Sequence, residues 1–397
     1  MVKVIGLDVS KSSVSVCLLE ERPTNPKQFY YQFSFEQLTA DASGIKRLLE
    51  LNPAIAIMEP TGINYQRLWG THLARAGIEV RLVGHKQLRT YRENHLGLPD
   101  KDDDADALAL ACYYFDYLED PQRFLQIREP TIVKIRELIL RLAHLNRVQS
   151  PIINRLRQNL AWQFPEVALV KSHRGKNGES PLLWGWLAGE RVSKKYDQLY
   201  QQSVGLGLTE FSVNHAKRLC DLQREELGIE LELTELLAHP QFTRYRKVFA
   251  RFGFGQRVSA LLLSQIYPFE NFLLPNGKPD IKIRRGRKSG KPTKRHLSQR
   301  RFQKALGVSP TLESSGDLKR SKIVGGSDLC RKALWQWLFT RIEAPSRRMN
   351  NEIGKILGDA LDQEKSAGRP IKLVRSRVCA KTARLLFKHL AEEFRLE

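Results

Sequence analysis

Short apolar runs alternate with polar segments over the first 120 residues and predict an α/β domain. Residues 2–21 alternate as in a β-hairpin, and residues 28–35 predict a third strand. The short apolar run at 54–58 predicts a buried strand, and the run at 79–84 predicts another strand. Helical patterns separate these strands, one of them opened by Ser43. Strands that alternate with helices in this way favour a mixed sheet covered by helices.

From about residue 130 the apolar spacing becomes that of long helices. Apolar residues recur every three or four positions, as in a coiled coil, at Ile135, Leu138, Leu142, Leu145, Ile152 and Leu156. Gln149 is the one polar residue at a position of this repeat. Pro151 lies inside the repeat, where it would kink a helix. The pattern therefore predicts either a coiled-coil stalk that pairs two copies or a helical hairpin within one subunit. A second helical run follows at about 208–238.

These shifts in pattern divide the chain into three predicted domains. Residues 1–125 form the α/β domain, and residues 126–238 form a helical bridge with an irregular insert near 170–205. Residues 239–397 form a mainly α-helical carboxyl-terminal domain with a basic insert at 278–304. A chain of 397 residues is long enough for two or three hydrophobic cores.

Positive charge is concentrated outside the first domain. The formal net charge is +22, but residues 1–120 hold 13 Lys and Arg against 17 Asp and Glu, and the rest of the chain holds 52 against 26. Within residues 278–304, 12 basic side chains accompany a single acid, Asp280. Because phosphate neutralisation supplies most non-specific affinity for nucleic acid, this asymmetry predicts a nucleic-acid partner. The alternatives are a merely soluble basic protein and, for residues 278–304, an inert solvated loop. The side chains expected to bind the nucleic-acid backbone are Arg284, Arg285, Arg287, Lys288, Lys294, Arg295, Arg300 and Arg301.

The cysteines and the apolar runs indicate in which cellular compartment the protein is expected. The five cysteines are far apart and never in a CxxC or CxxH spacing, which predicts free thiols in a reducing environment and argues against zinc. The chain begins with an apolar strand rather than a signal peptide, and no apolar run approaches 18 residues. We therefore expect a cytoplasmic, nucleoid-associated protein without a membrane partner.

Four carboxylates at three places in the first domain carry the candidate chemistry. Asp8 and Glu59 each stand at the polar end of an apolar strand, and Asp103 and Asp106 are three residues apart on a following helix, so they share one face. Each acid alone has a structural explanation, as a hairpin cap, a partner of an arginine or a helix-start acid. If the four converge, their mutual repulsion favours a bound cation, and Mg²⁺ prefers oxygen ligands. Together they form the ligand set that two-metal phosphodiester chemistry needs.

The motifs around these acids resemble those of a known family, the DEDD-type transposases of insertion sequences, with the related Piv-type DNA invertases. The similarity lies in GLDVSKSSVSVCLL, IMEPTGINYQRLWGTHL and VRLVGHKQLRTY followed by KDDDADALALA, and, in the last third, in LGVSPTLESSG followed by GGSDLCRKALWQWL. It covers most of residues 1–120 and about 240–345. The resemblance implies a RuvC-like, ribonuclease-H-type catalytic domain, a helical or coiled-coil bridge, and a carboxyl-terminal transposase domain that bears a serine.

The same resemblance implies a recombinase that binds Mg²⁺ through Asp8, Glu59, Asp103 and Asp106. Its nucleophile would be Ser315, in the P-x4-S-G pattern, with Ser314 as the alternative. The family also implies homodimers or tetramers that act on donor and target DNA, and several members use a structured guide RNA that pairs with both DNAs.

The chain departs from the family pattern at two places, and a third feature leaves the register of the acid motif open. The basic insert at 278–304 and the enlarged bridge near 170–205 are the departures. Asp102 and Asp104 crowd the acid motif, so a shift of one residue stays open.

Three other functions also stay open. A RuvC-like nuclease or junction resolvase would use water as its nucleophile and need only the four acids. A sugar-kinase or actin-like ATPase shares the GLDVSKSSVSV pattern, but the sequence lacks the second Gly-rich phosphate turn and the adenosine Gly pair that such enzymes need. A non-catalytic nucleic-acid-binding protein would owe its affinity to charge alone.

Overall fold

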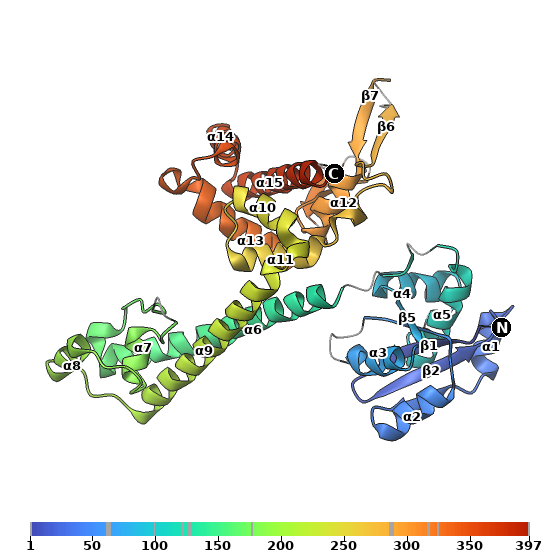
Figure 1. The fold of residues 1–397 in the computed structure, drawn as a ribbon, viewed down its shortest axis with the longest axis horizontal. Coiled ribbons are helices and arrows are strands. Elements are labelled where there is room, and N and C mark those ends of the chain that lie inside the picture. The colour runs from blue at the N-terminus through green and yellow to red at the C-terminus, as the bar shows by residue number, and fades with distance from the viewer. Residues whose placement is uncertain are drawn as a thin grey trace. The chain divides into compact units, whose positions relative to one another are not determined.

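The computed structural model describes residues 2–60, 65–98, 100–120, 123–125, 129–175, 178–285, 290–315, 318–323 and 325–395, and within 312–322 it describes the backbone only. The chain divides into two compact units, Met1–Arg128 and Glu129–Glu397. The first unit is α/β and the second is mainly helical (Figure 1), which confirms the predicted fold class at this level.

A five-stranded mixed sheet organises the first unit. Its strands are β1 (Val4–Val9), β2 (Ser13–Leu19), β3 (Glu36–Thr39), β4 (Ile55–Met58) and β5 (Glu79–Leu82), in the order β3-β2-β1-β4-β5. β2 runs antiparallel to β1 and β3, whereas β4 runs parallel to β1 and β5. The sheet is mixed, as the sequence pattern predicts. The predicted hairpin, the predicted buried strand at 54–58 and the predicted strand at 79–84 are confirmed, although β5 is only partly buried.

The third strand is not where the sequence pattern predicts it. The prediction of a strand at residues 28–35 is wrong, because most of this segment belongs to a helix, α1 (Pro26–Gln32). The side chain of Asn25 caps α1 by accepting the backbone N–H of Gln28 at 3.1 Å, and Pro26 occupies the first turn. Residues 28–35 alternate between aromatic and polar side chains like a strand, although Asn25 and Pro26 start a helix. The third strand of the sheet is instead β3, which is more polar.

Helices cover both faces of the sheet. α2 (Ala42–Glu50) and α3 (Tyr65–Arg75) share one apolar core with the sheet, and α4 (His85–Asn94) and α5 (Asp103–Asp116) share a second core with it. The predicted helix near Ser43 is confirmed, but its cap is Asp41, whose carboxylate accepts the backbone N–H of Gly44 at 2.9 Å.

α5 lies directly against β1 because Gly6 has no side chain. A Cβ atom at Gly6 would lie 2.0 Å from the carbonyl oxygen of Ala107 and 2.7 Å from the amide nitrogen of Ala111. The small residues of α5 make the same approach possible from the other side, and four of its alanines are buried, namely Ala105, Ala107, Ala109 and Ala111. This contact brings the end of β1 close to the first turn of α5.

The second unit is mainly helical. Its helices are α6 (Pro130–Gln163), α7 (Leu182–Leu187), α8 (Lys194–Gln201), α9 (Glu210–Ala238), α10 (Thr243–Arg251), α11 (Gln256–Ile266), α12 (Leu297–Ala305), α13 (Asp328–Leu338), α14 (Glu352–Ser366) and α15 (Ile371–Glu393). Its strands form two antiparallel hairpins, β6 (Ile281–Arg285) with β7 (Pro292–His296), and β8 (Pro310–Ser315) with β9 (Leu318–Ile323).

The state of the cysteines and the membrane-spanning potential of the helices concern both units. All five cysteines, Cys17, Cys112, Cys220, Cys330 and Cys379, are buried and free, as predicted. Over the described part of the chain, no helix is both long enough and apolar enough to cross a membrane.

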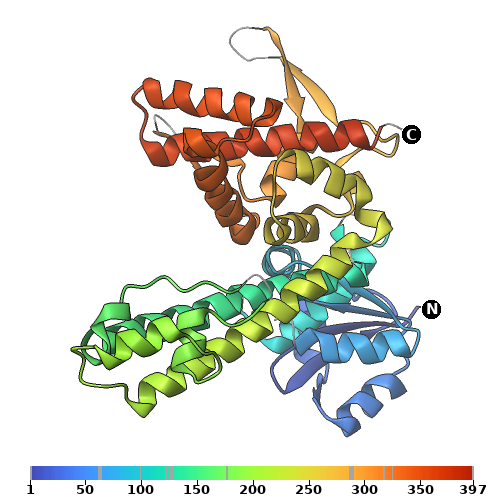
Figure 2. The ribbon, with the colours of Figure 1, turned by 60° about the vertical axis from the view of Figure 1, so that its left-hand side comes forward.

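α6 and α9 pack side by side as an antiparallel hairpin within one chain (Figures 1 and 2). α6 continues through Pro151, and Gln149 fits the repeat because its side-chain amide donates to the buried carboxylate of Glu226 on α9 at 3.0 Å. Of the two alternatives that the sequence leaves open, a stalk between copies or a hairpin within one subunit, the second is present in this structure.

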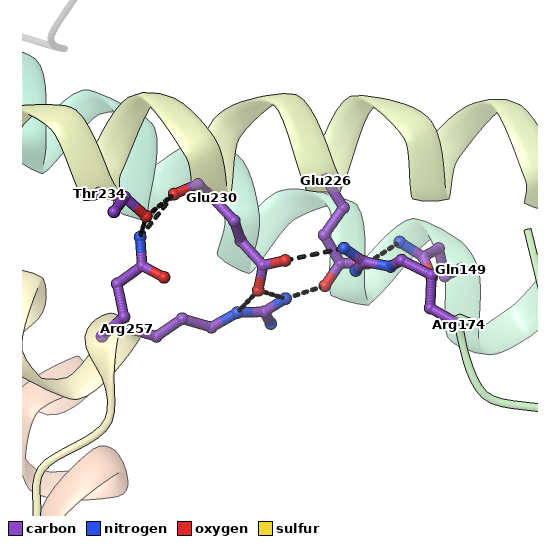
Figure 3. A network of polar contacts seen from close by, with 7 residues as sticks. Gln149, Arg174, Glu226, Glu230, Thr234 and Arg257 are labelled. Carbon is purple, nitrogen blue, oxygen red and sulfur yellow. Dashed lines mark hydrogen bonds and ion pairs between the residues drawn. The ribbon is translucent and has the colours of Figure 1, made fainter. Parts of the chain in front are cut away.

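A polar network joins this hairpin to α11 (Figure 3). Arg257 donates from Nε to Glu230 at 2.7 Å and also pairs with Glu226, and Arg174 donates to the other oxygen of Glu230 at 2.8 Å. The base of the hairpin also shares one apolar core with α10, α11 and α13–α15. The sequence predicts a domain boundary after residue 238, whereas in the structure this point is the end of α9 inside one unit.

Candidate active site

Asp8 and Glu59 come from neighbouring parallel strands. The register pairs Leu7 with Met58, so the next residues, Asp8 and Glu59, follow as neighbours on strands about 4.8 Å apart. Because side chains alternate between the faces of a strand, Asp8 shares the face of Gly6, which α5 covers. The register thus places both acids at one edge of the sheet.

The first turn of α5 supplies the other acids. Asp102 is the N-cap, and its carboxylate accepts a backbone N–H of that turn at 2.7 Å. Asp104 accepts a hydrogen bond from the hydroxyl of Ser15 on β2. Asp102 and Asp104 therefore have partners of their own, and this leaves Asp103 and Asp106 as the pair with the predicted spacing.

The four predicted acids lie close enough to influence one another. The pKa of Asp8 is raised to about 7, first by burial and then by the charges of Asp106, Asp103 and Glu59. A hydrogen bond with Asp103 contributes to the same increase. Burial also raises the pKa of Asp106, against the opposing charge of Arg92. The structure thus brings together the four carboxylates that the sequence singles out.

A buried arginine on α4 holds one of these acids. Arg92 is 2% exposed, and its Nε lies 2.8 Å from Oδ1 of Asp106. The same guanidinium donates to the carbonyl oxygen of Leu98 at 3.1 Å and to that of Asp100. Arg92 therefore ties α4, the segment before α5 and the carboxylate of Asp106 into one arrangement.

A histidine at the start of α4 contacts a second acid. Nδ1 of His85 lies 2.6 Å from Oε2 of Glu59. Neither His85 nor Arg92 is among the site residues that the sequence predicts. Their signal is the spacing of His85, Arg89 and Arg92, four and then three residues apart, which places three basic side chains on one face of a helix.

The donor set of the acids fits magnesium. Asp8, Glu59, Asp103 and Asp106 offer only carboxylate oxygens, and a divalent cation would relieve the repulsion that raises the pKa of Asp8. Among the described residues, no three Asp, Glu, His or Cys side chains are already arranged around a common point where a metal would bind. The contacts of Glu59 with His85 and of Asp106 with Arg92 account for this, because each turns a carboxylate toward a basic side chain.

A pocket of about 390 Å³ opens beside the acids. Its lining residues are Glu59, His85, Arg89, Arg92, Glu93, Lys101 and Asp106. Basic side chains next to metal-binding carboxylates can hold the phosphates of a polyanion that the acids alone would repel. A larger and shallower hollow of about 810 Å³ lies over α2 and α3, away from these acids.

The remaining predicted residues lie in the second unit. The backbone of Ser315 pairs with that of Leu318 at the end of the β8–β9 hairpin, and the side chains of Ser314 and Ser315 lie outside the described ones. The predicted nucleic-acid contacts that are described are Arg284 and Arg285 on β6, Lys294 and Arg295 on β7, and Arg300 and Arg301 on α12. Arg287 and Lys288 lie outside the described residues.

We expect Arg92→Ala to lower the free energy of unfolding by about 3 kcal/mol, because it leaves Asp106 buried without its cation. Arg89→Ala is the matched control. Arg89 is an exposed residue of the same helix, and its pair with Glu93, 2.7 Å long, is a surface i,i+4 contact worth about 0.5 kcal/mol. Thermal melting of the metal-free protein measures both effects, and equal losses would contradict the assigned role of Arg92.

The raised pKa of Asp8 predicts that stability depends on pH. Between about pH 4 and pH 7 the folded protein keeps a proton on Asp8 that the unfolded chain has released, so the free energy of unfolding falls as pH rises across this window. From pH 5 to pH 8 we expect metal-free wild type to lose about 2 kcal/mol relative to Asp8→Asn, which cannot ionise. Mg²⁺ should restore stability at pH 8 in the wild type only. Parallel melting curves for the two proteins would contradict this expectation.

One family model and two solved structures are similar to parts of this chain. Residues 5–165 match the family model of a transposase, the DEDD type of the IS110 insertion sequences. Among solved structures, the chain is similar to Thermus thermophilus RuvC, with 14% identity over 31% of this chain and 99% of that chain, at a TM-score of 0.22. It is also similar to T. thermophilus RuvC in complex with Holliday junction substrate, with 16% identity over 32% and 100%, at a TM-score of 0.23. The chain matches no curated protein.

Proposed function

We propose that this protein is a DNA transposase of the DEDD type that cleaves and rejoins strands with Mg²⁺, and the match of residues 5–165 to the transposase family model supports this proposal. The observation that carries the proposal is the convergence of Asp8, Glu59, Asp103 and Asp106 at one edge of the sheet. Four carboxylates in a partly buried site suit a cation and a phosphodiester better than they suit a structural role.

The site residues would divide the work as follows. Asp8, Glu59, Asp103 and Asp106 would hold Mg²⁺, which when bound would polarise the phosphodiester and favour deprotonation of the attacking hydroxyl. Arg92 would keep the carboxylate of Asp106 in place through its fixed contacts. The basic side chains of the pocket, such as Arg89 and Lys101, would bind phosphates beside the one that reacts.

The proposed nucleophile is Ser315. Its hydroxyl oxygen would attack phosphorus and lose its proton, and the DNA strand would leave as a free hydroxyl end. The phosphoserine ester would retain the energy of the broken phosphodiester, so a second DNA hydroxyl could displace the serine without ATP. The acids and Ser315 belong to different units of the fold, so catalysis would need the two half-sites to meet on DNA, within one subunit or between subunits of a dimer or tetramer.

We also propose a structured guide RNA as a partner, as the family resemblance implies. The basic excess beyond residue 120 supports a large nucleic-acid load, with 52 basic against 26 acidic side chains. In such a complex, base pairing would select the DNA sequence while the protein contacts the backbone.

The test of the proposed function is a strand-transfer assay with the full-length protein. The substrates are supercoiled plasmids that carry the DNA flanking its gene, with and without RNA transcribed from that DNA. We expect cleaved and rejoined products with Mg²⁺ and none with EDTA. Products that form equally well in EDTA would contradict the proposal.

A further inference from the structure

The β6–β7 hairpin projects beyond the helices of the second unit as a two-stranded ribbon (Figures 1 and 2). All five residues of β6 are exposed, and so are four of the five in β7. Ile283 is 71% exposed and Ile281 44%. An isolated two-stranded ribbon is only marginally stable in water, so a ribbon without a core of its own gains most from a partner.

The ribbon is strongly basic. Half of the ten strand residues are Lys or Arg, namely Lys282, Arg284, Arg285, Lys294 and Arg295, and the two strands contain no acid. None of these five side chains forms an ion pair with another described residue. By contrast, Arg375 and Arg377 on α15 each have a carboxylate partner. Unpaired positive charge on a projecting element points to a polyanion outside the chain.

The register distributes these charges unequally between the two faces. Lys282 pairs with Arg295 and Arg284 with Thr293, and directly opposite residues of a sheet point to the same side. We call this side the basic face. The opposite face carries Arg285 and Lys294, together with Ile281, Ile283, Pro292 and His296. The basic face therefore offers three cations and no apolar side chain larger than the threonine methyl, and the Thr293 hydroxyl donates to the carbonyl oxygen of Arg284 at 2.9 Å.

The dimensions of the ribbon favour B-form DNA over duplex RNA. The major groove of B-form DNA is about 12 Å wide and admits a two-stranded ribbon, whereas the major groove of an A-form RNA helix is too deep and narrow. Lys282 and Arg284 are two residues apart on one strand, about 6.6 Å, which is close to two base-pair steps of 3.4 Å. The donors of the basic face match the acceptor atoms that guanine and the phosphates present in this groove.

We propose that the β6–β7 ribbon docks in the major groove of duplex DNA with its basic face toward the bases. This inference rests on the proposed function, because that function supplies DNA as the substrate. It adds a specific contact to the general positive charge of the second unit. The ribbon would position the DNA, and the acids of the first unit would do the chemistry.

The experiment compares two double variants that each remove two cations. Lys282→Ala with Arg295→Ala changes the basic face, and Arg285→Ala with Lys294→Ala changes the opposite face. Binding of full-length protein to a fluorescent DNA duplex, and to an RNA duplex of the same sequence, is measured by anisotropy in EDTA over a range of KCl concentrations. All four side chains are on the projecting ribbon, so thermal melting should stay at the wild-type value and verify that both variants fold.

We expect the basic-face variant to bind DNA about 30-fold more weakly and to lose about two units of salt dependence, and the opposite-face variant to weaken by about threefold. Equal losses from the two variants would overturn the docking model, because charge alone would then explain binding. RNA duplex binding that is as tight as DNA binding and equally sensitive to the basic face would overturn the choice of DNA. If the wild type transfers strands but neither variant changes DNA binding, only the ribbon inference fails. If the wild type binds no DNA, the proposed function fails with it.

Discussion

Asp103→Asn should reduce magnesium-dependent DNA cleavage by at least about 1,000-fold, which corresponds to about 4 kcal/mol of transition-state stabilisation. Asp103 lies in the first turn of α5 and shares a hydrogen bond with Asp8, so its carboxylate is central to the acid group. Asparagine keeps the shape of the side chain but removes the charge that would hold Mg²⁺. Binding of DNA in EDTA should stay within about twofold of wild type, because the basic surface of the second unit is unchanged.

Asp102→Asn is the matched control for this variant. Asp102 is the neighbouring residue and also carries a negative charge, but it caps α5, and asparagine caps helices as well as aspartate does. Strand cleavage and melting temperature should both stay close to wild type. Loss of cleavage in Asp102→Asn with full activity in Asp103→Asn would show that the metal motif is shifted by one residue. Full activity in both variants would contradict the metal site itself.

Ser315→Ala should abolish strand exchange and the covalent protein–DNA adduct. Only a protein hydroxyl can form an ester with the cleaved strand, so the adduct is visible as a shifted band on a denaturing gel when wild type reacts with labelled DNA. We expect exchange to fall by at least about 1,000-fold, because alanine has no nucleophilic atom. The acids lie in the other unit, so Mg²⁺ should still raise the melting temperature of the first unit in this variant.

Ser314→Ala is the control, since it removes the adjacent hydroxyl and leaves Ser315 in place. It should keep both the adduct and strand exchange. The reverse result would make Ser314 the nucleophile. Undiminished cutting by Ser315→Ala without any adduct would instead favour a nuclease of the RuvC-like type that uses water, for which the four acids suffice.

The sequence predicts most elements of the first unit because their patterns are local. The β-hairpin, the buried strand at 54–58, the strand at 79–84 and the following helices need only alternation, apolar runs and caps. The strand predicted at 28–35 fails because a local start signal at Asn25 and Pro26 outweighs the aromatic pattern. Two physical signals compete in that segment, and the side-chain cap with its proline determines the result.

The division into domains could not be predicted in the same way. A change of pattern after residue 238 marks the end of a helix, but it does not show whether the helices on either side share a core. The network of Glu226, Glu230 and Arg257 joins residues from distant parts of the chain, and no local pattern contains that information. Gln149 interrupts the apolar repeat of the sequence, and its partner Glu226 lies 77 residues away in the chain, beyond the reach of any local pattern.

By itself, the sequence determined which residues could do the chemistry. The types and spacing of Asp8, Glu59, Asp103 and Asp106 predict a cation site, because acids at strand ends and at i,i+3 on a helix have few alternatives as a group. The distribution of charge likewise predicts where nucleic acid would bind.

Only the tertiary structure decided how those residues are held. The parallel register of β1 and β4 and the missing side chain of Gly6 bring the acids together, and both depend on contacts between segments about 50 to 100 residues apart. The same holds for Arg92 on Asp106 and for the two unequal faces of the β6–β7 ribbon. Residue type and spacing fix what a side chain can bind, whereas packing between distant segments fixes which side chains meet.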